Sequence, residues 1–184
     1  MLRGILKSRK GKFKTSLFQP LTQLELVANH KDKGSLEYLQ DAKILVHYQT
    51  LHTEVVKSTM VMFISEMLKN TIHEEEENGE LYDYLEGSIN WLDTHADIAN
   101  FHLLFLLKLT QYLGFYPEDS EIELPYFNLI DGVFQHSKIN GYCVSGAVLE
   151  NLKLLLGTNF EALHEIKLTK SNRAELLELL LNYY

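Results

Sequence analysis

Hydrophobic spacing divides the chain into a strand-like first part and a helical remainder. Apolar residues near Leu24, Leu26 and Ala28 alternate with polar ones, the period of a half-buried strand. The polar run at residues 30–34 ends in a glycine and is typical of a turn. Four residues continue the β pattern beyond it: Leu36, Tyr38, Ile44 and Val46. We therefore expect short strands over residues 1–48.

From about Thr50 the apolar spacing becomes that of helices. The predicted helices cover residues 51–68, 81–92, 98–113 and 148–156, and a last one begins at Asn172. The third is apolar on nearly its whole circumference, which indicates a central, buried helix. Asp93 or Thr94 is its expected N-cap, and Gly114 its expected end.

Between the third and fourth helices the pattern is irregular. Glycines and prolines punctuate residues 115–145, and a short hairpin is predicted near Phe127–Phe134. The last helix is strongly apolar up to Tyr184. We expect its apolar face to be exposed there, and hence further residues after Tyr184.

The charge is strongly polarised along the chain. Residues 1–40 carry eight basic and three acidic side chains, whereas residues 41–184 carry nine basic and twenty-two acidic ones. Six of the seventeen cations lie in the first fourteen residues: Arg3, Lys7, Arg9, Lys10, Lys12 and Lys14. Such a cluster suits a polyanion, either nucleic acid or an anionic membrane, and a merely solvated tail is the third interpretation. Its glycines argue against a membrane-surface helix, so nucleic acid is preferred.

Candidate chemistry is sparse. A single cysteine, Cys143, excludes an internal disulfide and a thiolate zinc cluster, and it is expected to be a buried thiol. His95 and His102 could share a helix face but lack a ligand at helical metal spacing, so we expect structural or surface histidines. Glu74–Glu77 is expected to be a solvated acidic run. Without a nucleophile motif or a phosphate loop, we expect no catalysis, no metal and no cofactor.

Aromatic residues in the irregular segment allow two interpretations. They either anchor the segment to the core or line a groove for a partner's peptide, and anchoring is preferred. The set is Phe115, Tyr116, Tyr126, Phe127 and Phe134. No secretory signal and no stretch of roughly 20 apolar residues is present, so a soluble cytoplasmic protein is expected.

Four stretches together resemble one known family. They read LRGILKSRKGKFKTSLFQPLTQLEL at residues 2–26, IANFHLLFLLKLTQYLGFYP at 98–117, YFNLIDGVF at 126–134 and GYCVSG at 141–146. In this order they resemble the RecO family of DNA repair proteins, and its Bacteroidetes and flavobacterial branch most closely. The resemblance covers essentially the whole chain.

The resemblance implies an α+β fold, with an OB-fold β-barrel that binds DNA followed by an all-α helical domain. Residues 1–48 would be a partial barrel, and residues 49–184 the helical domain. Its basic strand-and-turn segment maps onto Arg3, Lys7, Arg9, Lys10, Lys12 and Lys14. Where many RecO proteins hold a four-cysteine zinc module, this chain keeps only Cys143, so we expect no such zinc site. Relatives extend further at both ends, so we expect a chain truncated at both ends.

The resemblance also implies a function without bond breaking. RecO proteins act in the RecF pathway, anneal complementary strands, partner RecR, engage the single-stranded DNA-binding protein SSB and help RecA load onto SSB-coated strands. We therefore expect a nucleoid-associated, cytoplasmic bacterial protein that binds single- and double-stranded DNA and no membrane. The alternative is a helical module that docks RecR or SSB and has no DNA binding of its own.

Overall fold

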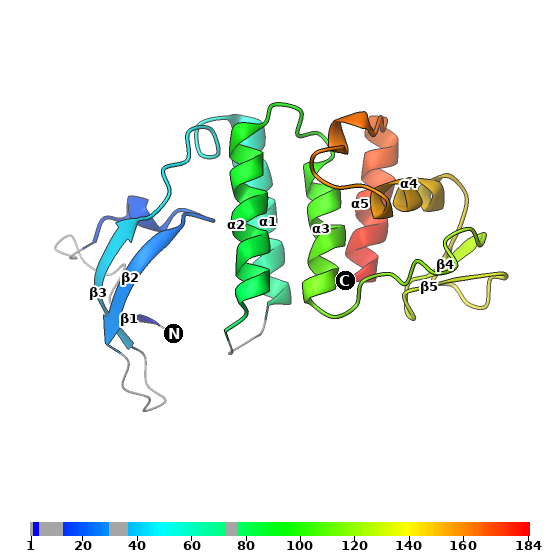
Figure 1. The fold of residues 1–184 in the computed structure, drawn as a ribbon, viewed down its shortest axis with the longest axis horizontal. Helices are drawn as coiled ribbons and strands as arrows, with labels where there is room; N and C mark the ends of the chain where they lie inside the picture. The colour runs from blue at the N-terminus through cyan, green and yellow to red at the C-terminus, as the bar shows by residue number, and fades with distance from the viewer. Residues whose placement is uncertain (1, 4–12, 30–36, 73–76) are drawn as a thin grey trace. The chain divides into compact units, whose positions relative to one another are not determined.

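The computed structural model describes residues 2–3, 13–29, 37–72 and 77–184. It divides into two compact units, Met1–Glu66 and Met67–Tyr184. The fold is mixed α and β, with the five helices and two small sheets drawn in Figure 1. The predicted division at residues 48 and 49 stays a prediction.

Unit 1 contains a three-stranded sheet in the order β1-β3-β2. Strands β2 (Leu24–Asn29) and β3 (Glu37–Ile44) are antiparallel, and β1 (Leu2–Arg3) pairs parallel with the start of β3. The 3₁₀ helix η1 (Thr15–Phe18) precedes β2, and the backbone is extended again at Gln19, just before Pro20. The predicted turn at residues 30–34 lies outside the described residues.

Strand formation at β2 was predicted correctly, but its burial was not. The side chain of Leu24 is half-buried, and those of the next five residues are exposed, Leu26 and Val27 by 44% and 45%. No described side chain from residue 13 to residue 50 is buried. The alternation of β2 therefore does not mark a core-facing side.

Helix α1 (Val55–Thr71) begins in unit 1 and runs across the boundary between the units. It starts five residues later than the predicted Thr50. The Thr53 hydroxyl donates to the carbonyls of Gln49 and Thr50, at 3.0 and 3.3 Å, and closes a turn there instead. Among the described ranges, no helix is long and apolar enough to cross a membrane.

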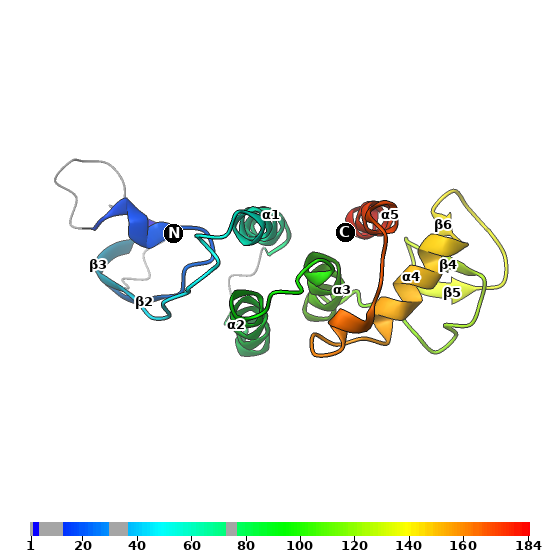
Figure 2. The same ribbon diagram turned by 90° about the horizontal axis from the view of Figure 1, so that it is seen from above.

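Unit 2 is built around α3 (Phe101–Tyr112), as predicted. Eight of its twelve residues are buried, and it contacts α2 (Gly79–Thr94), α4 (Ala147–Leu156) and α5 (Lys170–Tyr183). Figure 2 shows α2, α4 and α5 around it. Rings add to this packing: Tyr84 stacks on Phe105 and donates a 2.8 Å hydrogen bond to its carbonyl, while Trp91 stacks on Phe101.

One detail of the helix ends differs from prediction and one agrees with it. Thr94 belongs to α2, where its hydroxyl bonds back to the Asn90 and Trp91 carbonyls, and the N-cap of α3 is Asn100. Gly114 adopts φ +83° just after α3, which is the predicted glycine stop.

The sequence predicts that the last helix leaves its apolar face exposed, and this prediction is wrong. Leu176, Leu179 and Leu180 are buried, and α5 packs on α3 and α4. The hydroxyl of Tyr184 donates to the carbonyl of Leu106 at 2.7 Å. Burial of Tyr183, near the end of this helix, raises the pKa of its hydroxyl group to about 12.

The predicted hairpin is present as strands β4 (Tyr126–Asn128) and β5 (Val133–Gln135), to which β6 (Cys143–Val144) adds. Cys143 is a buried free thiol, as predicted. Its Sγ accepts from Gln135 Nε2 at 2.9 Å and lies 3.3 Å from Asn140 Oδ1. These contacts of Cys143 with Gln135 and Asn140 lie in the part of the chain where the resemblance places a zinc module.

Candidate nucleic-acid interface

Two of the six predicted DNA contacts fall in described parts of unit 1. Arg3 lies in β1, paired in register with Tyr38 of β3, and Lys14 is the exposed N-cap residue of η1. The other four, Lys7, Arg9, Lys10 and Lys12, lie outside the described residues. The basic segment thus runs from the edge strand of the sheet to the start of η1.

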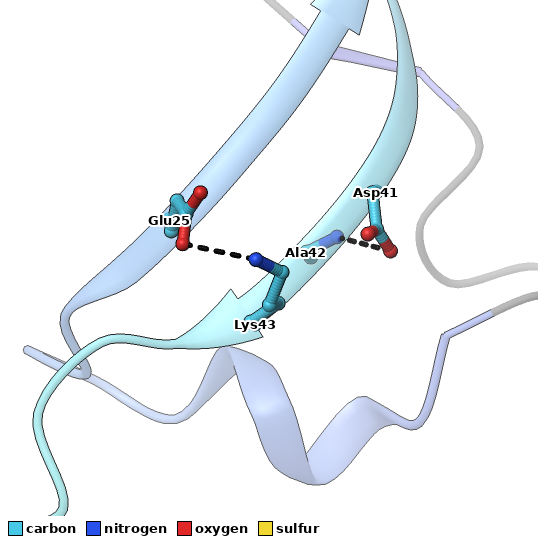
Figure 3. A network of polar contacts seen from close by, with 4 residues as sticks. All are labelled: Glu25, Asp41, Ala42 and Lys43. Carbon is cyan, nitrogen blue, oxygen red and sulfur yellow. Dashed lines mark hydrogen bonds and ion pairs between the residues drawn. The ribbon is translucent and has the colours of Figure 1, made fainter.

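The charged side chains of Glu25, Asp41 and Lys43 on the sheet all make local contacts. Lys43 Nζ of β3 lies 3.1 Å from Glu25 Oε2 of β2, and the two side chains are 60% and 56% exposed (Figure 3). The Asp41 carboxylate accepts a 3.0 Å hydrogen bond from the backbone N–H of Ala42. A cation beside a carboxylate presents less positive potential to a phosphate, so β2 and β3 contribute little net attraction.

A cavity of about 240 Å³ lies in unit 1, next to the basic segment in the chain. Three segments form it: η1 with the turn before β2, the end of β3, and the stretch that leads to α1. Its lining residues are Ser16, Gln19, Thr22, Ile44, Val46, His47, Tyr48 and His52. None of them was predicted as a binding residue, and the only sequence signal was the unusual local content of His and Tyr.

Hydrogen bonds hold the walls of this cavity in place. Leu21 adopts φ +56°, which closes a turn in which the Thr22 N–H donates to the Gln19 carbonyl at 3.1 Å. The Gln23 amide donates to the hydroxyl of Tyr48 at 2.8 Å. The Tyr48 and His52 rings meet edge to face, with centroids 6.4 Å apart. These hydrogen bonds and the ring contact therefore connect the segments that form the cavity.

Unit 2 has a second cavity, of about 390 Å³. Phe115 and Tyr116 line it with Tyr183 and Tyr184, while Phe127 and Phe134 are buried in the core. The buried members anchor the segment to the core, as preferred, whereas a groove for a partner's peptide stays a prediction.

Gly132 allows the close packing at this second cavity. A Cβ there would lie 2.7 Å from the Tyr183 hydroxyl, which donates to the Phe115 carbonyl. The carboxylates of Glu118 and Asp131 are also in the lining. Aromatic rings with carboxylates suit a basic side chain better than an acidic one.

Histidines do not form a metal site in the described ranges. No group of three or more His, Cys, Asp or Glu residues there could hold a metal ion. His95 and His102 do not share a helix face: His95 is the C-cap of α2 and stacks on Trp91, whereas His102 lies in α3. Burial and the nearby Arg173 lower the pKa of His102 to about 4. The Glu74–Glu77 run is described only at its exposed last residue.

Comparison with known proteins adds to this geometry. Residues 52–184 match the family described as "Recombination protein O C terminal". The whole chain is 56% identical to the DNA repair protein RecO of Christiangramia forsetii and covers 77% of that protein. It is 42% identical to the RecO of Flavobacterium psychrophilum and 33% identical, over 186 aligned positions, to that of Phocaeicola vulgatus, covering 76% and 77% of them.

These matches fit the structural observations. The family match begins at His52, three residues before α1, and includes every α-helix of the described structure. The full-length matches extend it through the basic segment and the three-stranded sheet of unit 1. The chain belongs to the RecO family of DNA repair proteins.

Proposed function

We propose that this protein binds DNA through unit 1 and acts as a mediator of recombinational repair. Its basic segment, Arg3 to Lys14, neutralises phosphates, while complementary strands are held for annealing. Residues 1–48 act as part of an OB-fold, and residues 49–184 as the helical domain. In this proposal, RecR and SSB are the protein partners and RecA loading is the outcome, with no bond made or broken in DNA.

One observation carries the proposal above the others: cations are concentrated at one end of an otherwise acidic chain. Residues 41–184 have a net charge of −13, from nine basic and twenty-two acidic residues. A polyanion would be repelled by that part and attracted only by the basic segment. Annealing needs little more than this, because the main barrier between two strands is the repulsion of their phosphates.

The test is the salt dependence of single-stranded DNA binding, measured by fluorescence anisotropy. If all six cations contact phosphates, log K falls against log[salt] with a slope of about −4. Changing Lys7, Arg9, Lys10 and Lys12 together to Ala should reduce the slope to about −1 and weaken binding sharply.

A control variant separates position from net charge. Four lysines of the α1 and unit 2 surface, Lys69, Lys138, Lys167 and Lys170, are exposed. Changing them to Ala alters the net charge by the same amount and should leave the slope near −4. Equal weakening in both variants would refute the proposed site.

A second candidate function is supported by the cavity of unit 2. Its aromatic lining and its two carboxylates suit a basic segment of a protein partner, as expected for a docking module without DNA binding. An acidic tail, such as that of SSB, would be repelled there. Pull-down of SSB with and without its acidic tail, beside the DNA-binding assay, separates the two functions: capture without DNA binding favours docking alone, and capture that does not need the acidic tail favours this cavity as the docking site.

A further inference from the structure

The cavity of unit 1 has the chemistry of a nucleobase site. Its lining holds hydroxyl and amide groups from Ser16, Gln19 and Thr22, two apolar side chains from Ile44 and Val46, and the ring of Tyr48. A base is a flat apolar ring with a polar edge, and proteins bind unstacked bases with aromatic or apolar faces and edge hydrogen bonds. The lining offers both parts together.

The same lining is poorly suited to a phosphate. None of the eight lining residues is Lys or Arg, the side chains that bind phosphates most strongly, and none is Asp or Glu. The cavity therefore neither attracts a phosphate strongly nor repels a strand that passes its mouth. In a chain with 25 acidic residues, a lining free of carboxylates keeps the site open to an anionic polymer.

The cavity's size limits it to a small group. Its 240 Å³ lies below the roughly 300–1,000 Å³ of pockets for drug-sized ligands, so one base fits and a stacked pair does not. The cavity is also close in the chain to a predicted phosphate contact. Lys14, the last of the basic cluster, is two residues before Ser16 of the lining. A phosphate bound at Lys14 would place its base within reach of this cavity.

One buried polar atom of the lining, Nε2 of His52, has no hydrogen bond from described protein groups. A ring nitrogen of His donates or accepts according to its tautomer. The exocyclic amino and carbonyl groups of a base supply partners of both kinds.

We propose that this cavity binds one unstacked base of a single DNA strand, with the phosphates outside on the basic segment. The inference rests on the proposed DNA binding and adds a base contact to its charge contacts. Held in this way, the strand keeps its neighbouring bases free for pairing. Edge hydrogen bonds in a cavity of fixed size would also hold the strand in one register.

The experiment compares two oligomers with the same number of phosphates. One is a thymidine oligomer of about 15 nucleotides, and the other is an abasic oligomer of equal length, since single-strand sites span roughly 4–16 nucleotides. The unchanged protein should bind the thymidine oligomer about tenfold more tightly, the effect of one stacked base. Ser16→Phe, an exposed position whose new ring would fill the cavity, should bring the affinity ratio near one.

Two tyrosine variants keep the test independent of folding. Tyr48→Leu removes the aromatic wall and should lower the ratio, whereas Tyr48→Phe keeps the ring and should preserve most of it. Tyr82→Leu is the matched control, because Tyr82 is half-exposed in α2 of unit 2 and is not a lining residue of the cavity. Circular dichroism checks that each variant is folded.

The outcomes separate this inference from the proposed function. A ratio that falls in Ser16→Phe while the salt slope stays near −4 supports a base site. A ratio unchanged by Ser16→Phe and Tyr48→Leu overturns the base site and leaves DNA binding intact. Equal loss for both oligomers with a shallower slope means that the cavity holds a phosphate, which also overturns it. Failure of the unchanged protein to bind either oligomer refutes the proposed function itself.

Discussion

The sheet region of unit 1 and the helices of unit 2 distribute their apolar side chains in opposite ways. Unit 2 surrounds α3 with buried leucines and phenylalanines, and eight residues of that helix are buried. In unit 1, no described side chain between residues 13 and 50 is buried, and Leu26 and Val27 of β2 are nearly half exposed. Stability in this chain comes mainly from unit 2, because buried apolar area is the main favourable term in folding.

The difference has a functional reading. A three-stranded sheet whose described side chains are not buried is only marginally stable without further packing. Such a surface is, however, free to contact a ligand along its whole length, and a bound strand would itself stabilise it by mass action. The basic cluster and the base-sized cavity both belong to this less stable unit.

The most direct way to break the comparison is the same substitution in each unit. Leu104 of α3 is fully buried, so Leu104→Ala should cost about 2–5 kcal/mol of unfolding free energy. Leu26 of β2 is 44% exposed, so Leu26→Ala should cost less than about 0.5 kcal/mol. Urea denaturation followed by circular dichroism measures both. Equal losses would mean that β2 has a core side that its exposure does not reveal.

Sequence reasoning succeeded where one local pattern determines the answer. The apolar circumference of α3 predicted its central place, and Gly114 predicted its end. The start of α3 was predicted wrongly, because the Thr94 hydroxyl can either cap a following helix or donate to carbonyls of its own helix. Only the folded α2 shows that it does the latter. Local spacing cannot distinguish the two.

Features that join distant residues could not be predicted from sequence. The unit 1 cavity brings Ser16 together with Tyr48 and His52, and no spacing rule relates them. The burial of α5 was misjudged for the same reason, since its partners α3 and α4 precede it by many residues. Alternation in β2 predicted a strand correctly but not its burial, because burial depends on what packs against the sheet.

A second prediction concerns acid sensitivity, which should be confined to unit 2. Burial and Arg173 lower the pKa of His102 from 6.5 to about 4, so the unfolded chain takes up this proton first. The stabilisation is complete above about pH 6.5 and is lost as the pH falls towards 4, a change of about 3 kcal/mol. Denaturation midpoints measured from pH 7 to pH 4 test this. His102→Gln should flatten the profile, and His136→Gln, at an exposed position, should leave it unchanged.

The third prediction compares two glycines of unit 2. Gly132 has φ +68°, and an added Cβ would lie 2.7 Å from the Tyr183 hydroxyl. Gly132→Ala should therefore cost about 2–3 kcal/mol, from the left-handed backbone and the displaced hydrogen bond to Phe115. Gly87 of α2 has open space around it, so Gly87→Ala should stabilise by about 0.5–1 kcal/mol. Thermal denaturation of both variants suffices, and a neutral Gly132→Ala would contradict the close contact.

The smallest expected effect comes from two matched ion pairs, one in each unit. Glu25–Lys43 spans β2 and β3, and Glu150–Lys153 lies within α4, at 3.1 and 3.0 Å. Exposed pairs contribute about 0.2–1 kcal/mol, so Glu25→Gln should barely change stability. Lys153 is only 15% exposed but Glu150 is 66% exposed, so Glu150→Gln should cost little more. Their effects on DNA binding should differ, because only Glu25→Gln frees a lysine in the unit that carries the basic segment.

Single-stranded DNA binding across a salt series measures that difference. Glu25→Gln should make the slope of log K against log[salt] steeper by up to about 0.7, the contribution of one added phosphate contact. Glu150→Gln changes the net charge equally and should leave the slope as it was. If both variants steepened the slope alike, total charge would govern binding and the sheet of unit 1 would have no special part in it. If only Glu25→Gln did, Lys43 would be a phosphate contact restrained by its own neighbour, and the DNA surface would extend from the basic segment onto β3.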